Sequence, residues 1–169
     1  TATGQLQISN AELQKFTSGG MSIGGLICGK QTIAGVENAH SAAIAGIVTL
    51  SANRDDGRVV FRDASSTFVA LSAQGDDGVE LRVPVTAKTG SLYFDADVEN
   101  SNLADNDNKL GFTDGCTVKS GGIMTIEATT GTIVPKGATT LSAGGGLVLH
   151  DTFEPLFAFY NQVLNADND

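Results

Sequence analysis

The chain repeats a short phrase, an apolar strand that ends in Ser, Asp, Glu or Asn immediately before Ala. Copies occur at residues 48–52, 69–73, 93–96, 124–128, 139–143 and 163–166. Alternating apolar and polar positions predict short strands, and the Gly- and Asp-rich residues that follow predict turns. A strand-turn unit that cannot bury its own apolar face is stabilised by stacking on its neighbours, so the pattern predicts a solenoid.

The spacing of the phrase favours a parallel β-helix with irregular rungs of about 20 residues. The last apolar residues of the copies are separated by 21, 23, 32, 15 and 23 positions, and they are Leu50, Leu71, Phe94, Ile126, Leu141 and Leu164. Helical repeats are longer and show a period of 3.6 residues. We therefore expect an all-β solenoid over residues 1–151 in which the first five of these side chains point inward.

An antiparallel β-sandwich is the alternative fold. Asp56-Gly57 and Asp77-Gly78 have the composition of hairpin turns. Against this, the sequence Leu-Ser-Ala-x-x-Asp-Asp-Gly recurs at 50–57 and 71–78. Parallel stacking accounts for that repetition directly, because equivalent residues then lie side by side on neighbouring rungs.

Composition and charge narrow the class of function. The 169 residues include 41% apolar residues, 21 Gly, 3 Pro and no Trp. No apolar run reaches the length of a membrane span, so we expect no transmembrane segment. The formal charge of -9 is spread along the chain, and such a surface repels nucleic acid.

Cys28 and Cys116 do not have the spacing of a zinc or dithiol site, and both a disulfide and free thiols remain open.

The acidic pairs are candidate cation ligands. If residues 50–57 stack on 71–78, Asp55 and Asp56 lie one rung from Asp76 and Asp77, about 4.8 Å away. Carboxylates at that distance repel one another, and Ca²⁺ or the neighbouring arginines would compensate. The alternative interpretation is that these aspartates lie in solvated turns, for which Asp-Gly sequences are typical. A second, weaker calcium candidate is the half EF-hand-like run 105–111, in which Lys109 replaces an oxygen ligand.

Paired carboxylates also suit glycoside hydrolysis or elimination, which makes a carbohydrate-active or carbohydrate-binding β-helix the alternative function. The aromatic residues that commonly hold sugars are concentrated in one segment at 152–169. We expect this segment to be a cap or a linker that leads into a further repeat, and to carry an interface formed by Phe153, Phe157, Phe159 and Tyr160.

Several runs resemble the degenerate repeats of filamentous-haemagglutinin-type surface proteins and related giant repeat proteins. These runs are 92–98, 112–118, 120–131 and 138–146. The resemblance implies a right-handed parallel β-helix in an extracellular or cell-surface adhesin or filament. It implies no enzyme activity and no cofactor, and its partners would be neighbouring repeats or like subunits stacked end to end, together with surface glycans. We accordingly expect a non-enzymatic module that serves as a rigid spacer or assembly unit.

Overall fold

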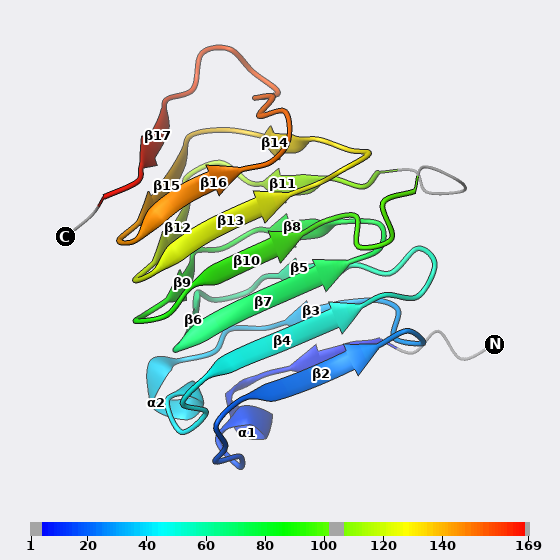
Figure 1. Ribbon diagram of the computed structural model, residues 1–169, viewed down its shortest axis with the longest axis vertical. Helices are drawn as coiled ribbons and strands as arrows, with labels where there is room; N and C mark the ends of the chain where they lie inside the picture. The colour runs from blue at the N-terminus through cyan, green and yellow to red at the C-terminus, as the bar shows by residue number, and fades with distance from the viewer. Residues whose placement is uncertain (1–4, 102–106, 168–169) are drawn as a thin grey trace.

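The computed structural model describes residues 5–101 and 107–167, and they form a β-solenoid of three parallel sheets (Figure 1). The first two residues of the 105–111 calcium candidate, 105 and 106, therefore lie outside the described residues. Sheet 1 contains β1 (Leu6–Ile8), β3 (Gln31–Ile33), β5 (Val59–Phe61), β8 (Val79–Leu81), β11 (Leu110–Phe112) and β14 (Ile133–Pro135). Sheet 2 contains β2 (Met21–Gly25), β4 (Ile47–Ala52), β7 (Ala70–Gly75), β10 (Leu92–Asp95), β13 (Ile123–Glu127) and β16 (Gly146–Leu149). Sheet 3 contains β6 (Ser66–Phe68), β9 (Val85–Ala87), β12 (Cys116–Ser120), β15 (Thr139–Ala143) and β17 (Gln162–Asn165).

Each turn of the chain is here called a rung. Each of the four rungs from β5 to β16 contributes one strand to every sheet, and the chain then continues to the next rung. The strand pairs of all three sheets are parallel, so the antiparallel sandwich alternative is wrong. The steps between successive sheet 1 strands vary because the loops differ in length, as the irregular spacing of the repeated phrase predicted.

The register corrects one detail of the sequence interpretation. Leu71 lies beside Val48 and Leu92, whereas Leu50 lies beside Ala73. The copies of the phrase at 48–52 and 69–73 are therefore shifted by two residues relative to each other. The shift leaves the same side chains pointing inward, because side chains alternate with a period of two. Leu141 belongs to sheet 3, so the phrase marks strands of two different sheets.

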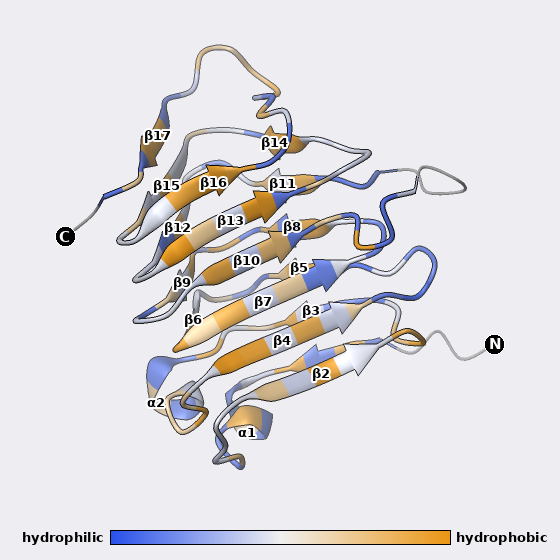
Figure 2. Ribbon diagram, in the orientation of Figure 1, coloured by the Kyte–Doolittle hydropathy of each residue, from blue (hydrophilic) through white to orange (hydrophobic). Residues whose placement is uncertain are grey.

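The core is a continuous column of apolar side chains between the sheets, and apolar and polar residues alternate along the strands (Figure 2). Leu50, Leu71, Phe94, Ile126 and Leu141 are each at most 1% exposed, which confirms their predicted inward orientation. Phe61 and Phe94 meet across sheets 1 and 2 with ring centroids 6.1 Å apart. Burial on this scale supplies most of the folding free energy of a chain that has few other cross-links.

Two short helices take the place of sheet 3 in the first two rungs. They are α1 (Asn10–Leu13) and α2 (Asn38–Ser41). Ser9 and Glu12 form a capping box at the start of α1, which satisfies amide groups that the short helix leaves unpaired. Ser41 Oγ donates to the carbonyl oxygen of Thr67, 2.6 Å away, and this bond ties α2 to the first strand of sheet 3. Among the described residues no helix has the length and apolar character needed to cross a membrane.

Residues 152–167 complete the last rung. Phe153 forms a parallel bridge with Ile133, and the amide of Leu156 donates to the carbonyl of Pro135 over 2.8 Å. The chain then returns to sheet 3, where β17 pairs with β15. Cys28 and Cys116 are both free thiols, and burial raises the pKa of Cys116 to about 12.

Candidate functional site

The four aspartates of the calcium prediction lie at the corner between sheets 2 and 1, but in two different settings. Asp76 and Asp77 form a short buried turn between β7 and β8. The equivalent connection in the rung below, residues 53–58, is longer, and Asp55 and Asp56 lie on its exposed loop. The amide of Asp77 therefore meets the carbonyl of Gly57, at 2.8 Å, and the two acidic pairs do not stack in the register that the sequence predicted.

Asp77 is fully engaged by protein groups. Its Oδ2 accepts a hydrogen bond from Arg58 Nε over 2.8 Å, and its Oδ1 accepts one from the amide of Asp107 over 3.0 Å. Arg58 also forms an ion pair with Asp107, with Nη1 and Oδ2 separated by 3.1 Å. The side chain of Asp77 is only 4% exposed, so this arrangement compensates a buried negative charge and joins three rungs.

Asp76 is less well compensated. One of its carboxylate oxygens, Oδ2, is buried and has no hydrogen-bond partner. Burial raises the pKa of Asp76 above its ordinary value, and the negative charge of Glu99 acts in the same direction, whereas a hydrogen bond from the backbone of Asp56 opposes them. The described part of the chain contains no group of three or more His, Cys, Asp or Glu side chains arranged to hold a metal ion. Calcium binding at Asp55, Asp56, Asp76 and Asp77 stays a prediction.

Other aspartates bind the backbone of a neighbouring rung. Asp97 Oδ2 accepts from the amide of Thr130 over 2.7 Å, and Asp114 Oδ1 accepts from the amide of Ala138 over 2.7 Å. In the last rung Asp151 Oδ2 accepts from the amide of Ala128 over 2.6 Å. Amide groups in turns have no hydrogen-bond partner in the ladders between strands, and these carboxylates accept their hydrogen bonds.

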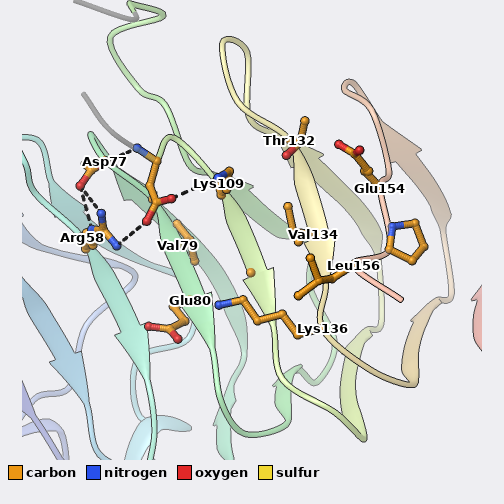
Figure 3. A pocket seen from close by; sticks show the side chains of 14 residues that line it. Arg58, Asp77, Val79, Glu80, Lys109, Thr132, Val134, Lys136, Glu154 and Leu156 are labelled. Carbon is orange, nitrogen blue, oxygen red and sulfur yellow. Dashed lines mark hydrogen bonds and ion pairs between the residues drawn. The ribbon is translucent and has the colours of Figure 1, made fainter. Parts of the chain in front are cut away.

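A hollow of about 420 Å³ lies on the outer face of sheet 1 (Figure 3). Its floor includes Gly111, the outward residue of β11, which has no side chain between those of Glu80 and Val134 on the adjacent strands. A Cβ atom at Gly111 would lie 4.0 Å from Lys136 Nζ and 4.0 Å from Glu80 Cγ. The absence of one side chain thus opens the hollow, and Lys136 reaches over it.

The lining of the hollow alternates cations and anions. The network of Arg58, Asp77, Asp107 and Lys109 closes one end, where Lys109 Nζ lies 3.2 Å from Asp107 Oδ1. Glu80 accepts a hydrogen bond from Arg82 over 2.8 Å, and this contact lowers the pKa of Glu80. The backbone amide of Lys136 donates to the carbonyl oxygen of Phe112 over 2.8 Å, whereas its ammonium group forms no ion pair or hydrogen bond within the described part of the chain. The other wall is formed by Val134, Glu154, Pro155 and Leu156, so the hollow offers hydrogen-bonding groups beside an apolar surface.

A second polar cluster, which the sequence interpretation missed, lies on the outer face of sheet 2. Tyr93 Oη is 3.0 Å from Asp95 Oδ2 and 3.0 Å from Glu127 Oε2. Asp95 and Glu127 are direct neighbours on β10 and β13. Burial raises the pKa of Asp95, and burial together with the charge of Asp95 raises the pKa of Tyr93. Only the register brings these three together, because Glu127 lies 34 residues from Tyr93 in the chain.

Both ends of the stack expose apolar side chains. Twelve large apolar side chains of the described residues are exposed, and all except Ile47 and Ile123 belong to the first rung, residues 5–30, or the last, residues 146–167. In the predicted interface Phe157, Phe159 and Tyr160 are exposed, whereas Phe153 is partly buried against the core. At the opposite end a hollow of about 360 Å³ lies among β1, α1 and β2. The large apolar surface is therefore concentrated at the two ends.

Comparison of the chain with protein-family models, with curated proteins and with solved structures finds no match.

Proposed function

We propose that this chain is a non-enzymatic structural module, a rigid spacer or assembly unit of an extracellular or cell-surface adhesin or filament. The observation that carries the proposal is the continuity of the solenoid. Sheets 1 and 2 each run through six strands without a break in register, around one unbroken apolar core. In a stack built in this way, the orientation of one end is fixed relative to that of the other end.

The side-chain contacts between rungs support the same role. Asp77, Asp97, Asp114 and Asp151 each bind the backbone of a neighbouring rung through a loop amide, so the corners as well as the sheets are linked along the axis. Bending the stack would break ladder bonds and separate the packed core at the same time. Carboxylates used in this manner also explain an acidic sequence without assigning a catalytic residue.

Rigidity can be measured directly by electron paramagnetic resonance. Spin labels would be attached to cysteines introduced at Thr49 and Val163 in a Cys28→Ser background, since both positions are on strands far apart along the stack. We expect one narrow distance distribution. A broad or bimodal distribution would overturn the spacer role. Labelling of intact source cells with an antibody against this chain would test the surface location, and staining that requires permeabilised cells would contradict it.

The hollow over Gly111 favours a second candidate function, the binding of a carbohydrate. Ion-paired Glu80 and Asp107 retain free acceptor positions, and Val134 and Leu156 offer an apolar wall. The ammonium group of Lys136 is a donor without a hydrogen-bond partner among the described residues, although its charge acts on Glu80. Hydroxyl groups need such donors and acceptors, and the C–H face of a sugar ring needs the apolar wall. The ammonium group of Lys136 favours a sugar that carries a carboxylate.

Titration with a trigalacturonate, monitored by NMR, tests this second function. Gly111→Val should abolish binding because it fills the hollow, and Lys136→Gln should weaken it about tenfold, as expected for one charge-assisted contact. Lys119→Gln is the matched control, since Lys119 is an exposed cation on a strand of sheet 3. Binding that all three variants retain, or no binding to the unsubstituted chain, would overturn the carbohydrate site.

A further inference from the structure

We infer that the chain associates head to tail, with Phe159 of one copy inserted into the apolar hollow at the N-terminal end of the next. The inference rests on the proposed assembly role and identifies the partner as a second copy of this chain. Four observations carry it: the shape of one end, the protrusion at the other, the direction of the strand edges, and the distribution of charge.

The receiving surface is the hollow beneath the first rung. It has a volume of about 360 Å³, and its apolar lining consists of Leu6, Ile8, Leu13, Phe16, Met21 and Ile23. Ile8 and Leu13 are buried, and Phe16 at the rim is 44% exposed. This volume falls within the range of sites that hold a small ligand, so it has room for an aromatic side chain.

The protruding element is the loop between residues 156 and 162, which rises over the opposite end of the stack (Figure 1). Phe159 is 97% exposed, the largest exposed fraction of the large apolar side chains described. Phe157 and Tyr160 pack edge to face beside it, with ring centroids 6.0 Å apart. Exposure of a whole phenyl ring in water is unfavourable, and the ring gains most by entering an apolar hollow.

The strand edges at the two ends match in direction. In the order of the described strands, β2 and β16 are the terminal strands of sheet 2, and all neighbours within that sheet are parallel. If a second copy is displaced along the axis, its β2 therefore lies beside β16 of the first copy, and the two strands are parallel like the other neighbours in the sheet. Head-to-head contact would instead require antiparallel pairing. A heterologous contact of this kind propagates into an open filament.

Charge favours the same arrangement. The first rung, residues 5–30, contains Lys15 and Lys30 against Glu12, whereas the last rung, residues 146–167, contains Asp151, Glu154 and Asp167 and no Lys or Arg. Head-to-tail contact brings the only end with an excess of cations against the acidic end. Contact between two C-terminal ends would place six carboxylates together, which is unfavourable.

Sedimentation velocity of the intact chain over a concentration series tests the inference. We expect oligomers to grow with concentration, and we expect Phe159→Ser and Phe16→Ser each to weaken association at least about tenfold, as the loss of one buried aromatic contact predicts. Ile47→Ser and Ile123→Ser are the matched controls, because these side chains are 51% and 47% exposed on the flank of the stack. The controls should associate like the unsubstituted chain.

Mixing the two end variants makes the test specific to head-to-tail contact. The Phe159→Ser chain keeps an intact hollow and the Phe16→Ser chain keeps an intact protrusion, so an equimolar mixture should form heterodimers that do not grow further. Association that neither end variant weakens would overturn the Phe159 contact. A chain that stays monomeric at all concentrations would overturn the inference as well, whereas the spacer role would still be decided by the separate distance measurement.

Discussion

The phenol oxygen of Tyr93 lies 3.0 Å from Glu127 Oε2, across the boundary between two neighbouring rungs. The same oxygen lies 3.0 Å from Asp95 Oδ2. A phenol has one proton to donate, so the second contact is favourable only when a carboxyl group supplies another proton. The relationship therefore links the protonation of an outer-face carboxyl to the stability of the ladder between β10 and β13.

Stability should fall as pH rises through the titration of Asp95. Burial, together with the nearby charges of Glu127 and Asp97, raises its pKa in the folded chain. The folded state then holds a proton that the unfolded state releases above its ordinary pKa of about 3.9, so the contribution is present at acidic pH and is lost as pH increases. Hydrogen bonds from Asp97 and Tyr93 reduce the effect without reversing it.

Asp95→Asn should remove this dependence. The Asn side chain can still accept from the amide of Asp97, as Asp95 Oδ1 does over 3.1 Å, and its amide group can donate to Tyr93. We expect a gain of about 1 kcal/mol near neutral pH and no gain below about pH 3.9. Urea unfolding across this pH range measures it, with Asp63→Asn on the exposed surface as the control. A variant less stable than the parent at neutral pH would contradict the assignment.

Leu71→Asp should unfold the neighbouring rungs together. Leu71 is 1% exposed and lies between Val48 and Leu92 in the inner column of sheet 2. A buried charge without a partner costs several kcal/mol, and rungs that share one core lose stability as a unit. Circular dichroism during thermal unfolding measures the loss, and Leu71→Met should cost less than about 1.5 kcal/mol. Unchanged melting of Leu71→Asp would disprove the stacked core.

Arg58→Met should destabilise the chain more than Asp77→Asn does. The arginine variant leaves the carboxylate of Asp77 buried without its cation, whereas Asn at position 77 removes the charge itself. Because the Arg58 side chain is 37% exposed, we expect a loss of about 1–3 kcal/mol rather than the larger loss of a fully buried pair. Arg62→Met, which breaks only the exposed pair with Asp63, should cost less than about 1 kcal/mol. Chemical denaturation that gives Arg58→Met and Arg62→Met equal stability would refute the role of this pair.

Gly24→Ala should cost at least about 2 kcal/mol, and Gly25→Ala should cost less. Both glycines have positive φ angles, 99° and 138°. A Cβ atom at Gly24 would overlap the carbonyl oxygen of Ser51 and the side-chain nitrogen of Gln31, whereas a Cβ atom at Gly25 would meet nothing within 4 Å. The pair therefore separates steric overlap from backbone strain. An equal decrease in the denaturation midpoint of both variants would show that backbone strain alone causes the loss of stability.

Calcium binding at the acidic corner is open to a thermal-shift titration. If Asp55, Asp56, Asp76 and Asp77 hold Ca²⁺, the ion should raise the melting temperature with saturation, and Asp76→Asn should abolish the rise. Asp114→Asn, at a corner of the stack near sheet 3, is the control. An identical small shift in both variants and in the parent would indicate nonspecific screening and would disprove the site.

The fold was largely predictable because its signal is local. Alternation in residues 48–52 and 124–128 predicted strands, and the recurrence of the phrase predicted parallel stacking, which the sheets confirm. The register between copies was not predictable, because a shift by two residues leaves the same side chains inward and the loop lengths alone decide between the alternatives. The candidate sites depended on that register.

The sequence by itself determined the period-two alternation, the inward set that includes Leu50 and Phe94, and the excess of carboxylates. Only the tertiary structure decided which groups meet. It placed Asp77 against Arg58, brought Tyr93 to Glu127 and left a hollow over Gly111. The physical reason is that strand formation and burial follow from residues that are close together in the sequence. Contacts between rungs depend instead on loops of unequal length, which determine the register of one rung on the next.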